Sequence, residues 1–159
     1  MAAVDVTDES GRVECAPLER AATRLLDLLG KSDAELSVVV VGDHRMRELN
    51  HRWRGKDRPT DVLSFAQDVD GEKEGAPYEA ARSLGDVVIS ADTAMRQARD
   101  GGWTLAEELN RLLLHGVLHL LGFDHERGGE EARRMHAEES RLSARLIDEG
   151  IPCAREELG

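Results

Sequence analysis

Three histidines in the second half of the chain have a spacing that could bring them to one metal ion. His115 and His119 are four residues apart, and His125 follows after Gly122. Residues four apart project from the same face of an α-helix, so one ion can bind the first two imidazoles. Gly122 can adopt the left-handed backbone conformation that ends a helix, which would return His125 to the metal. Simple packing in an apolar helix is the alternative, but burying imidazoles without a partner is costly.

The donor set indicates which metal the site would hold. Neutral imidazoles suit zinc, and a zinc ion with three protein ligands keeps a fourth position for water, which is the catalytic arrangement. We therefore predict one zinc ion per chain at His115, His119 and His125, with nickel or another divalent transition metal as the alternative.

Carboxylates elsewhere in the chain are candidates to orient the ligand imidazoles through their second ring nitrogens. They are Asp86, Asp124 and Glu139. Each could equally serve as a helix cap or as a buried hydrogen-bond partner.

The histidine spacing also matches the H-E-x-x-H-x-x-G-x-x-H pattern of metzincin peptidases at every position but one. Those peptidases use the glutamate after the first histidine as the general base, and this chain has Gly116 there. Because glycine has no side chain that can move a proton, the sequence disfavours a peptidase and favours another kind of hydrolase.

A second candidate site is the basic segment 45–58, which reverses the sign of a chain whose net charge is −11. Its cations are Arg45, Arg47, Arg52, Arg54, Lys56 and Arg58, against the acids Glu48 and Asp57. Guanidinium groups match phosphate oxygens, so the segment indicates a phosphate-bearing substrate, with ordinary solvated charges as the alternative. We expect Trp53 and Phe65 to pack in the core rather than to stack on a base, since aromatic residues make up only 3% of the chain.

Length and composition favour a single domain over residues 1–159. The chain is 40% hydrophobic and 33% charged, as in soluble proteins with one core. It has no apolar run of about 20 residues, and its N-terminus is acidic, so we expect a cytoplasmic protein with no membrane partner. The negative charge argues against coating of nucleic acid, and DNA is not an expected partner. Cys15 and Cys153 form no disulfide or thiolate pattern.

The hydrophobic pattern predicts the elements that position these residues. Short β-branched runs predict strands at 3–6, 36–41, 61–66 and 84–90. Helical periodicity between capping residues and glycines predicts helices at 17–29, 43–53, 91–100, 105–121 and 130–149, and the polar segment 68–82 is expected to be a loop. We therefore predict an α+β domain with a small three- or four-stranded mixed sheet covered by about five helices. The metal site would lie on a central helix and the turn after it, while the order of the strands stays open.

The combination of motifs resembles the YbeY family of bacterial ribosomal-RNA maturation endoribonucleases. The resemblance rests on blocks that occur in order over about 90 residues: Leu49-Asn50, Arg54 to Asp57, Pro59 to Phe65, Leu84 to Ser90, His115 to His125, Met135 and Glu139. The first 35 residues and the segment 68–82 carry no such signature.

The resemblance implies a metal-dependent, single-strand-specific endoribonuclease that acts in small-subunit ribosomal RNA processing and ribosome quality control. It implies that the three histidines hold the metal and that Arg54 is the arginine associated with RNA cleavage. Arg52, Lys56 and Arg58 are then candidates to bind RNA, and small-subunit ribosomal proteins and assembly GTPases are candidate partners. Trp53 departs from the family pattern, which often has tyrosine there, so any role for a phenol is weakened.

Two other functions stay open at the level of sequence. One is a non-catalytic ribosome-assembly factor that a metal merely stabilises, although a structural zinc normally has four protein ligands. The other is a metal-dependent hydrolase of another substrate, with peptides disfavoured by Gly116.

Overall fold

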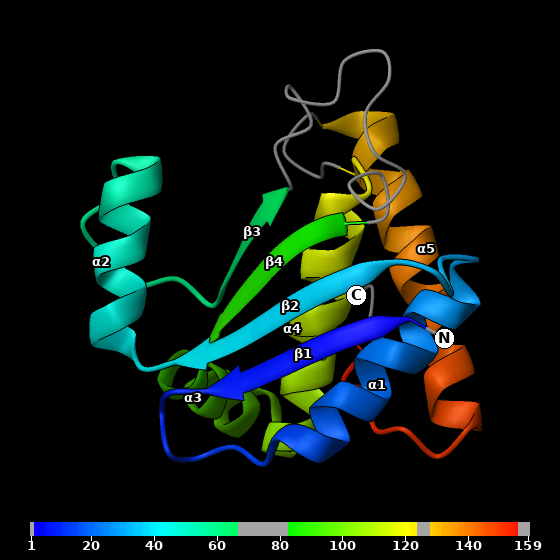
Figure 1. Ribbon diagram of the computed structural model, residues 1–159, viewed down its shortest axis with the longest axis horizontal. Helices are drawn as coiled ribbons and strands as arrows, with labels where there is room; N and C mark the ends of the chain where they lie inside the picture. Colours follow the sequence, from blue (N-terminus) through cyan, green and yellow to red (C-terminus); the bar gives the residue numbers. More distant parts are fainter. Residues whose placement is uncertain (1, 67–82, 124–127, 156–159) are drawn as a thin grey trace.

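The computed structural model describes residues 2–66, 83–123 and 128–155. Its elements follow in the order β1 (Ala3–Asp8), α1 (Cys15–Leu28), β2 (Glu35–Val41), α2 (Asp43–Arg54), β3 (Val62–Ala66), β4 (Ser83–Ser90), α3 (Ala91–Gly101), α4 (Leu105–Leu120) and α5 (Gly129–Asp148) (Figure 1). The predicted α+β class is therefore confirmed, with element ends that differ by a few residues. The predicted loop at 68–82 lies outside the described residues.

The four strands form one mixed sheet in the order β1-β2-β4-β3. β1, β2 and β4 run parallel, and β3 pairs antiparallel with β4 at one edge. The register between β2 and β4 shifts near Gly85, whose φ of 129° is accessible mainly to glycine. The strand order places β3 beside β4 and leaves β2 between β1 and β4, which hydrophobic periodicity alone could not reveal.

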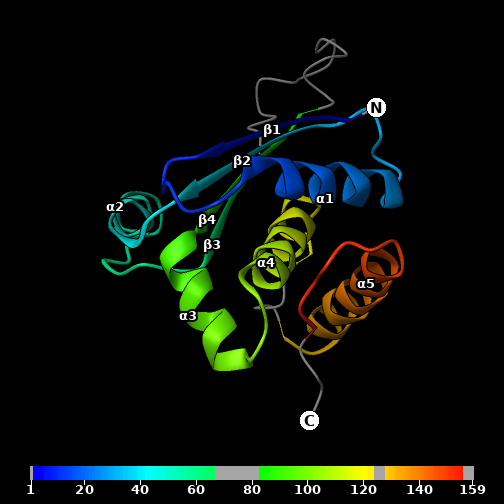
Figure 2. The ribbon, with the colours of Figure 1, turned by 90° about the horizontal axis from the view of Figure 1, so that it is seen from below.

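The two faces of the sheet carry separate hydrophobic clusters. Alternate side chains such as Val87 and Ile89 point to the larger cluster, where α1, α4 and α5 pack. Val88 points the other way, into a smaller cluster with Met46 of α2 and Leu63 of β3. Figure 2 shows α1, α4 and α5 together below the sheet and α2 apart from them. Hence α2 and α4 pack on opposite faces of the sheet.

Helix α4 is the central helix of the larger cluster, and its N-terminal half is firmly anchored. Thr104 and Glu107 form a capping box at its start, as their spacing predicts. One turn later the fully buried carboxylate of Glu108 accepts hydrogen bonds from Gln97, Trp103 and Arg111 at 2.6–3.0 Å. These bonds satisfy a charge that would be costly to bury alone, and they tie α4 to α3.

None of the helices in the described ranges is both long and apolar enough to cross a bilayer.

Candidate functional site

The first candidate site is the pair of histidines near the C-terminal end of α4. Their ring centroids are 4.7 Å apart, and the Nε2 atoms of His115 and His119 approach to 3.1 Å. The helical spacing of four residues thus places both imidazoles side by side, as predicted. Both rings are partly exposed, so a ligand can reach them.

Glu139 of α5 contacts the other side of this pair. Its Oε1 lies 3.2 Å from Nδ1 of His115, and both side chains are about three-quarters buried. A carboxylate there favours the tautomer in which Nδ1–H donates a hydrogen bond to it, which leaves the Nε2 lone pair of His115 directed towards His119. Two of the carboxylates predicted to orient the ligands, Asp86 and Glu139, lie in the described ranges, and of these two Glu139 contacts a histidine.

The geometry of the pair fits a shared metal ion. Two nitrogen ligands of a tetrahedral zinc ion, each at about 2.0–2.1 Å from the metal, lie about 3.3 Å from one another. The observed Nε2 separation of 3.1 Å is close to that value. Within the described ranges, no group of three His, Cys, Asp or Glu side chains is arranged around one point. The third expected ligand, His125, and the candidate Asp124 both lie outside those ranges.

The turn that would return His125 is present at the end of α4. Gly122 has a φ of 96°, and its N–H donates to the carbonyl of His119. The next N–H, of Phe123, donates to the carbonyl of Leu118. This pair of bonds is the Schellman motif, so the role predicted for Gly122 in ending the helix is confirmed.

Gly116 lies against the sheet rather than beside the histidine nitrogens. A Cβ atom at this position would lie 2.8 Å from Cγ1 of Val87 and 3.2 Å from Oγ of Ser64. Ser64 also donates to the Gly116 carbonyl at 2.8 Å, which holds β3 close to α4. A glutamate here has no room, so packing explains the glycine that breaks the metzincin pattern.

Asp86, a further predicted partner of the ligands, is not near them. It pairs across the sheet with Phe65, so the two side chains share a face, and Phe65 contacts Trp53 of α2. The following residue, Val87, is the one that faces α4. Strand alternation therefore carries Asp86 to the face opposite the histidines, where it is exposed.

The second candidate site is the C-terminal end of α2 with the loop that follows. Both acids of the segment are engaged: Glu48 with Arg45 at 3.8 Å and Asp57 with Arg47 at 2.7 Å. Within the described ranges the remaining cations are exposed and have no carboxylate partner; they are Arg52, Arg54, Lys56 and Arg58. The residues predicted to act on RNA are thus the ones whose charge is not neutralised.

Contacts that the sequence did not indicate fold this loop back onto α2. Buried Asn50 donates from Nδ2 to the carbonyl of Arg58 at 2.8 Å, and its own carbonyl accepts from Lys56 N–H. Arg47 binds Asp57 through both carboxylate oxygens, and this bond holds the pKa of Asp57 below its ordinary value. Because Asn50 is 2% exposed, these two bonds hold the backbone of the loop that carries Lys56 and Arg58 against the end of α2.

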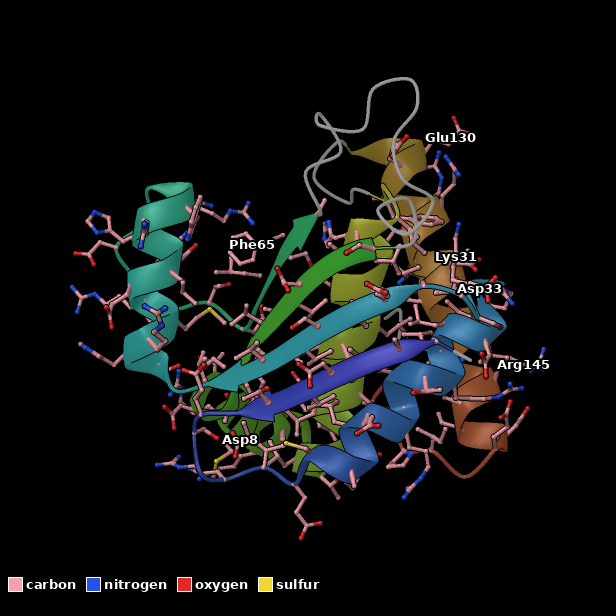
Figure 3. The ribbon with its side chains drawn as sticks, in the orientation of Figure 1. Asp8, Lys31, Asp33, Phe65, Glu130 and Arg145 are labelled. Atoms are coloured by element: carbon pink, nitrogen blue, oxygen red, sulfur yellow. The ribbon has the colours of Figure 1, made fainter. Side chains whose placement is uncertain are left out.

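Trp53 corrects the expectation of core packing. Its side chain is 60% exposed, and its ring meets Phe65 edge-on at a centroid distance of 6.0 Å. Phe65 points from β3 towards α2 and is partly buried there (Figure 3). The expectation was wrong for Trp53 because the buried positions of α2 are Met46 and Asn50, and Trp53 lies one turn beyond them at the end of the helix.

The basic end of α2 and the histidine pair are separated by one strand. Trp53 contacts Phe65 on one side of β3, whereas Gly116 contacts Ser64 on the other. No hydrogen bond or ion pair between described residues joins Arg54 to His115 or His119. Figure 1 shows β3 between α2 and α4.

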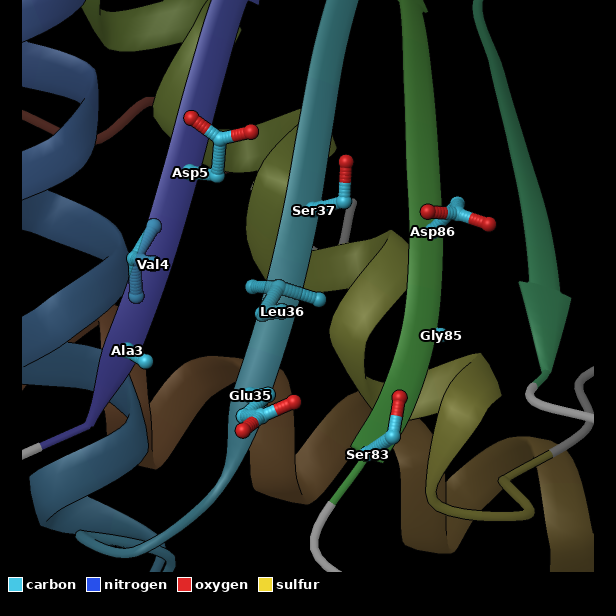
Figure 4. A pocket seen from close by; sticks show the side chains of 9 residues that line it. All are labelled: Ala3, Val4, Asp5, Glu35, Leu36, Ser37, Ser83, Gly85 and Asp86. Carbon is cyan, nitrogen blue, oxygen red and sulfur yellow. The ribbon is translucent and has the colours of Figure 1, made fainter. Parts of the chain in front are cut away.

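A groove on the sheet face where α2 packs is acidic, unlike the basic end of α2. Its volume is about 340 Å³, and it is lined by Ala3, Val4, Asp5, Glu35, Leu36, Ser37, Ser83, Gly85 and Asp86 (Figure 4). Its charged side chains are all carboxylates, which repel phosphate. The hollow therefore does not coincide with either candidate site, and we do not assign RNA to it.

These features define a small α+β domain with a candidate histidine metal site on one side of its edge strand and an unneutralised basic surface on the other. The family model described as Endoribonuclease YbeY matches residues 4–147. The Endoribonuclease YbeY of Geobacter metallireducens is 52% identical over 135 residues, which cover 84% of this chain and 87% of that one. The Endoribonuclease YbeY of Syntrophotalea carbinolica is 45% identical over 147 residues, which cover 92% and 95%. The chain belongs to the YbeY endoribonuclease family.

A solved structure agrees with this assignment at the level of the fold. The solution structure of TM1509 from Thermotoga maritima superposes with a TM-score of 0.63 and 26% sequence identity. The match covers 92% of this chain and 91% of that one.

Proposed function

We propose that this chain is a metal-dependent endoribonuclease that cleaves single-stranded RNA in the maturation and quality control of the small ribosomal subunit. The observation that carries the proposal is the approach of the His115 and His119 Nε2 atoms to 3.1 Å, with Glu139 on the far nitrogen of His115. The names of the relatives support a nuclease, and the basic end of α2 supports a phosphate-bearing substrate. Small-subunit ribosomal proteins and assembly GTPases remain candidate partners.

Each residue of the first site has a definable task in this proposal. His115 and His119 would hold the metal through Nε2, and His125 is the expected third ligand. Glu139 keeps the Nδ1 proton of His115 in place and so maintains the tautomer that the metal needs. When bound, a zinc ion would supply Lewis acidity to a phosphoryl oxygen or to the attacking oxygen.

Arg54 would bind the phosphate backbone of the strand being cut. Its guanidinium is permanently charged and has no carboxylate partner among the described residues, so its charge is available to phosphate oxygens. Because Arg54 and the histidines flank β3, the RNA would have to pass the edge of the sheet to reach both.

Cleavage of peptides is disfavoured by the packing of Gly116. The general base of metzincin peptidases would stand there, and Val87 and Ser64 fill that space. A non-catalytic assembly factor stays possible only if the histidine pair serves stability rather than turnover.

The experiment compares the wild-type chain, His119→Ala and Arg54→Ala on a single-stranded RNA and on the matching duplex. We expect the wild type to cut the single strand in preference, and each variant to lose cleavage by about 100-fold or more. Metal content should fall in His119→Ala and stay at one ion per chain in Arg54→Ala. Loss of cleavage in neither variant, with both folded, would show that the chain is not this kind of nuclease.

A further inference from the structure

Trp53 is a large aromatic side chain that lies mostly in solvent. At 60% exposure it leaves most of an indole in water, and in the described residues only Ile147, at 42%, is another large hydrophobic side chain left so open. A single exposed apolar side chain needs no special explanation, but an exposed aromatic ring among cations is the combination that proteins use to bind single-stranded nucleic acid. Trp53 belongs to neither hydrophobic cluster, so its ring is open to such a ligand.

The exposed ring is nevertheless held in place. Phe65 contacts its edge at 6.0 Å with an interplanar angle of 67°, and the guanidinium carbon of Arg52 lies 5.3 Å from the ring centroid. Phe65 itself packs against the smaller hydrophobic cluster beneath α2. Two contacts from two elements therefore orient the indole before any ligand arrives, which lowers the entropy lost on binding.

The chemistry around the ring selects the class of ligand. The exposed cations without acid partners, Arg52, Arg54, Lys56 and Arg58, surround Trp53 in the chain. A surface that offers a flat π-face next to cations suits a nucleobase with its phosphate. In a duplex the bases are already stacked on each other, so only an unpaired base can use such a ring.

We propose that Trp53, supported by Phe65 and Arg52, is a base-stacking platform for single-stranded RNA, set on the side of β3 opposite the histidine pair. The inference rests on the proposed function for its choice of RNA. It assigns a second contact point to the strand, beyond the bond that is cut, and it gives a physical source for single-strand selectivity. Because every base has a π-face, the platform tolerates any sequence.

The test is equilibrium binding of a labelled single-stranded 2′-O-methyl oligonucleotide of about 12 nucleotides, which cannot be cut through its own 2′-oxygens. Trp53→Ala should weaken binding by about tenfold or more, while Trp53→Phe and Trp53→Tyr should stay within about threefold of the wild type. Ile147→Ala is the matched control, since it removes the other exposed large hydrophobic side chain, and it should change nothing. Affinity for the matching duplex should be the same in Trp53→Ala and in the wild type.

Tryptophan fluorescence supplies a readout that would not change on RNA binding if Trp53 had only a structural role. The chain has two tryptophans, and the other one, Trp103, donates a hydrogen bond from Nε1 to Oε1 of the buried Glu108 at 3.0 Å. Oligonucleotide should quench the wild-type emission and leave that of Trp53→Phe unchanged, because the stacked ring is then gone.

The platform is overturned if Trp53→Ala binds the single strand within about twofold of the wild type, or if quenching persists in Trp53→Phe. It is also overturned if the wild type binds no single strand. These outcomes are separate from failure of the nuclease proposal, which is judged by cleavage in the wild type and His119→Ala. A chain that binds through Trp53 but does not cut would keep the platform and lose the catalytic assignment.

Discussion

At the scale of single residues, the contact between Glu139 and His115 determines how the histidine pair can act. A carboxylate oxygen 3.2 Å from Nδ1 favours the tautomer with the proton on that nitrogen. In that tautomer Nε2 presents a lone pair on the side of His119, as a metal ligand must. Among the carboxylates predicted from the sequence to do this, Asp86 is on the wrong face of the sheet.

We predict that Glu139→Gln weakens zinc affinity by about 10- to 100-fold without unfolding the chain, because the amide is a poorer acceptor for the Nδ1 proton. Competition with a chromophoric chelator measures the affinity. Glu138→Gln is the control, since the neighbouring Glu138 is buried to the same extent but pairs with Arg141 instead of a histidine. Equal zinc affinity in the wild type and Glu139→Gln would remove Glu139 from the site.

Sequence reasoning succeeded for placements that depend on local geometry. The side-by-side rings of His115 and His119 and the helix end at Gly122 follow directly from spacing. It failed for Trp53 and Asp86, because exposure and sheet face depend on which strand lies beside which. That information belongs to tertiary contacts and not to periodicity.

At the scale of elements, the close approach of α4 to the sheet is made possible by Gly116. The hydrogen bond from Ser64 to the Gly116 carbonyl and the short distance to Val87 show how little space remains. The distance between α4 and the sheet in turn determines how far His115 and His119 lie from β3.

We predict that Gly116→Ala lowers the free energy of unfolding by about 1–3 kcal/mol, because Val87 is not a flexible side chain that can move aside. Helix propensity alone predicts the opposite sign, a gain of about 1 kcal/mol. Urea denaturation distinguishes the two. In the Val87→Ala background the cost of Gly116→Ala should shrink, and a stabilised Gly116→Ala chain would contradict the packing argument.

The start of α2 is held by a different set of contacts. Asp43 accepts from Ser90 and Thr93 at 2.6 Å and pairs with Arg96 at 2.8 Å. Burial alone would raise the pKa of Asp43, but these bonds outweigh burial and lower it below the ordinary value of 3.8. They attach α2 to β4 and α3.

The consequence is a stability difference that depends on pH. A lowered pKa in the folded state means that the charged Asp43 stabilises the fold fully above pH 3.8, and that this stabilisation disappears as the pH falls through the folded-state pKa. We predict that Asp43→Asn lowers the free energy of unfolding by about 1–3 kcal/mol at pH 7. The loss should become smaller as the pH falls below 3.8 and through the lowered folded-state pKa of Asp43. The exposed variant Asp5→Asn should cost less than about 0.5 kcal/mol, and a pH-independent Asp43→Asn cost would rule out the charge effect.

At the scale of the whole molecule, charge is divided between surfaces. The chain carries a net charge of −11, yet the exposed end of α2 keeps four cations without described acid partners. The acidic groove over β1, β2 and β4 lies on the same face of the sheet as α2. The net charge thus predicts that the chain as a whole does not attract nucleic acid, but it does not reveal the local basic surface at the end of α2.

We predict that single-stranded RNA binding weakens with salt with a slope of about −3 in log affinity against log salt, from about 0.7 for each of the four neutralised phosphates. Arg58→Ala should make the slope shallower by about 0.7, and Arg20→Ala, an exposed cation of α1, should leave it unchanged. A slope near zero in the wild type would exclude this surface as the RNA contact.

The fold class, the mixed sheet and the helices follow from patterning, whereas their arrangement does not. Each element buries its own apolar residues whether α2 lies on one face of the sheet or the other, so the sequence leaves both open. The position of β3 between Trp53 and Gly116 is a property of the strand order. That order determines that one strand lies between the basic surface and the histidines.

The most direct test of the account is the stepwise return of zinc to metal-free chain, with RNA cleavage measured on the same sample. We predict that cleavage is absent without metal, rises in proportion to added zinc and reaches its plateau at one ion per chain, and that His119→Ala stays inactive throughout. Full cleavage by the metal-free chain, or a plateau reached equally well by His119→Ala, would contradict the assignment of the histidine pair as the catalytic metal site.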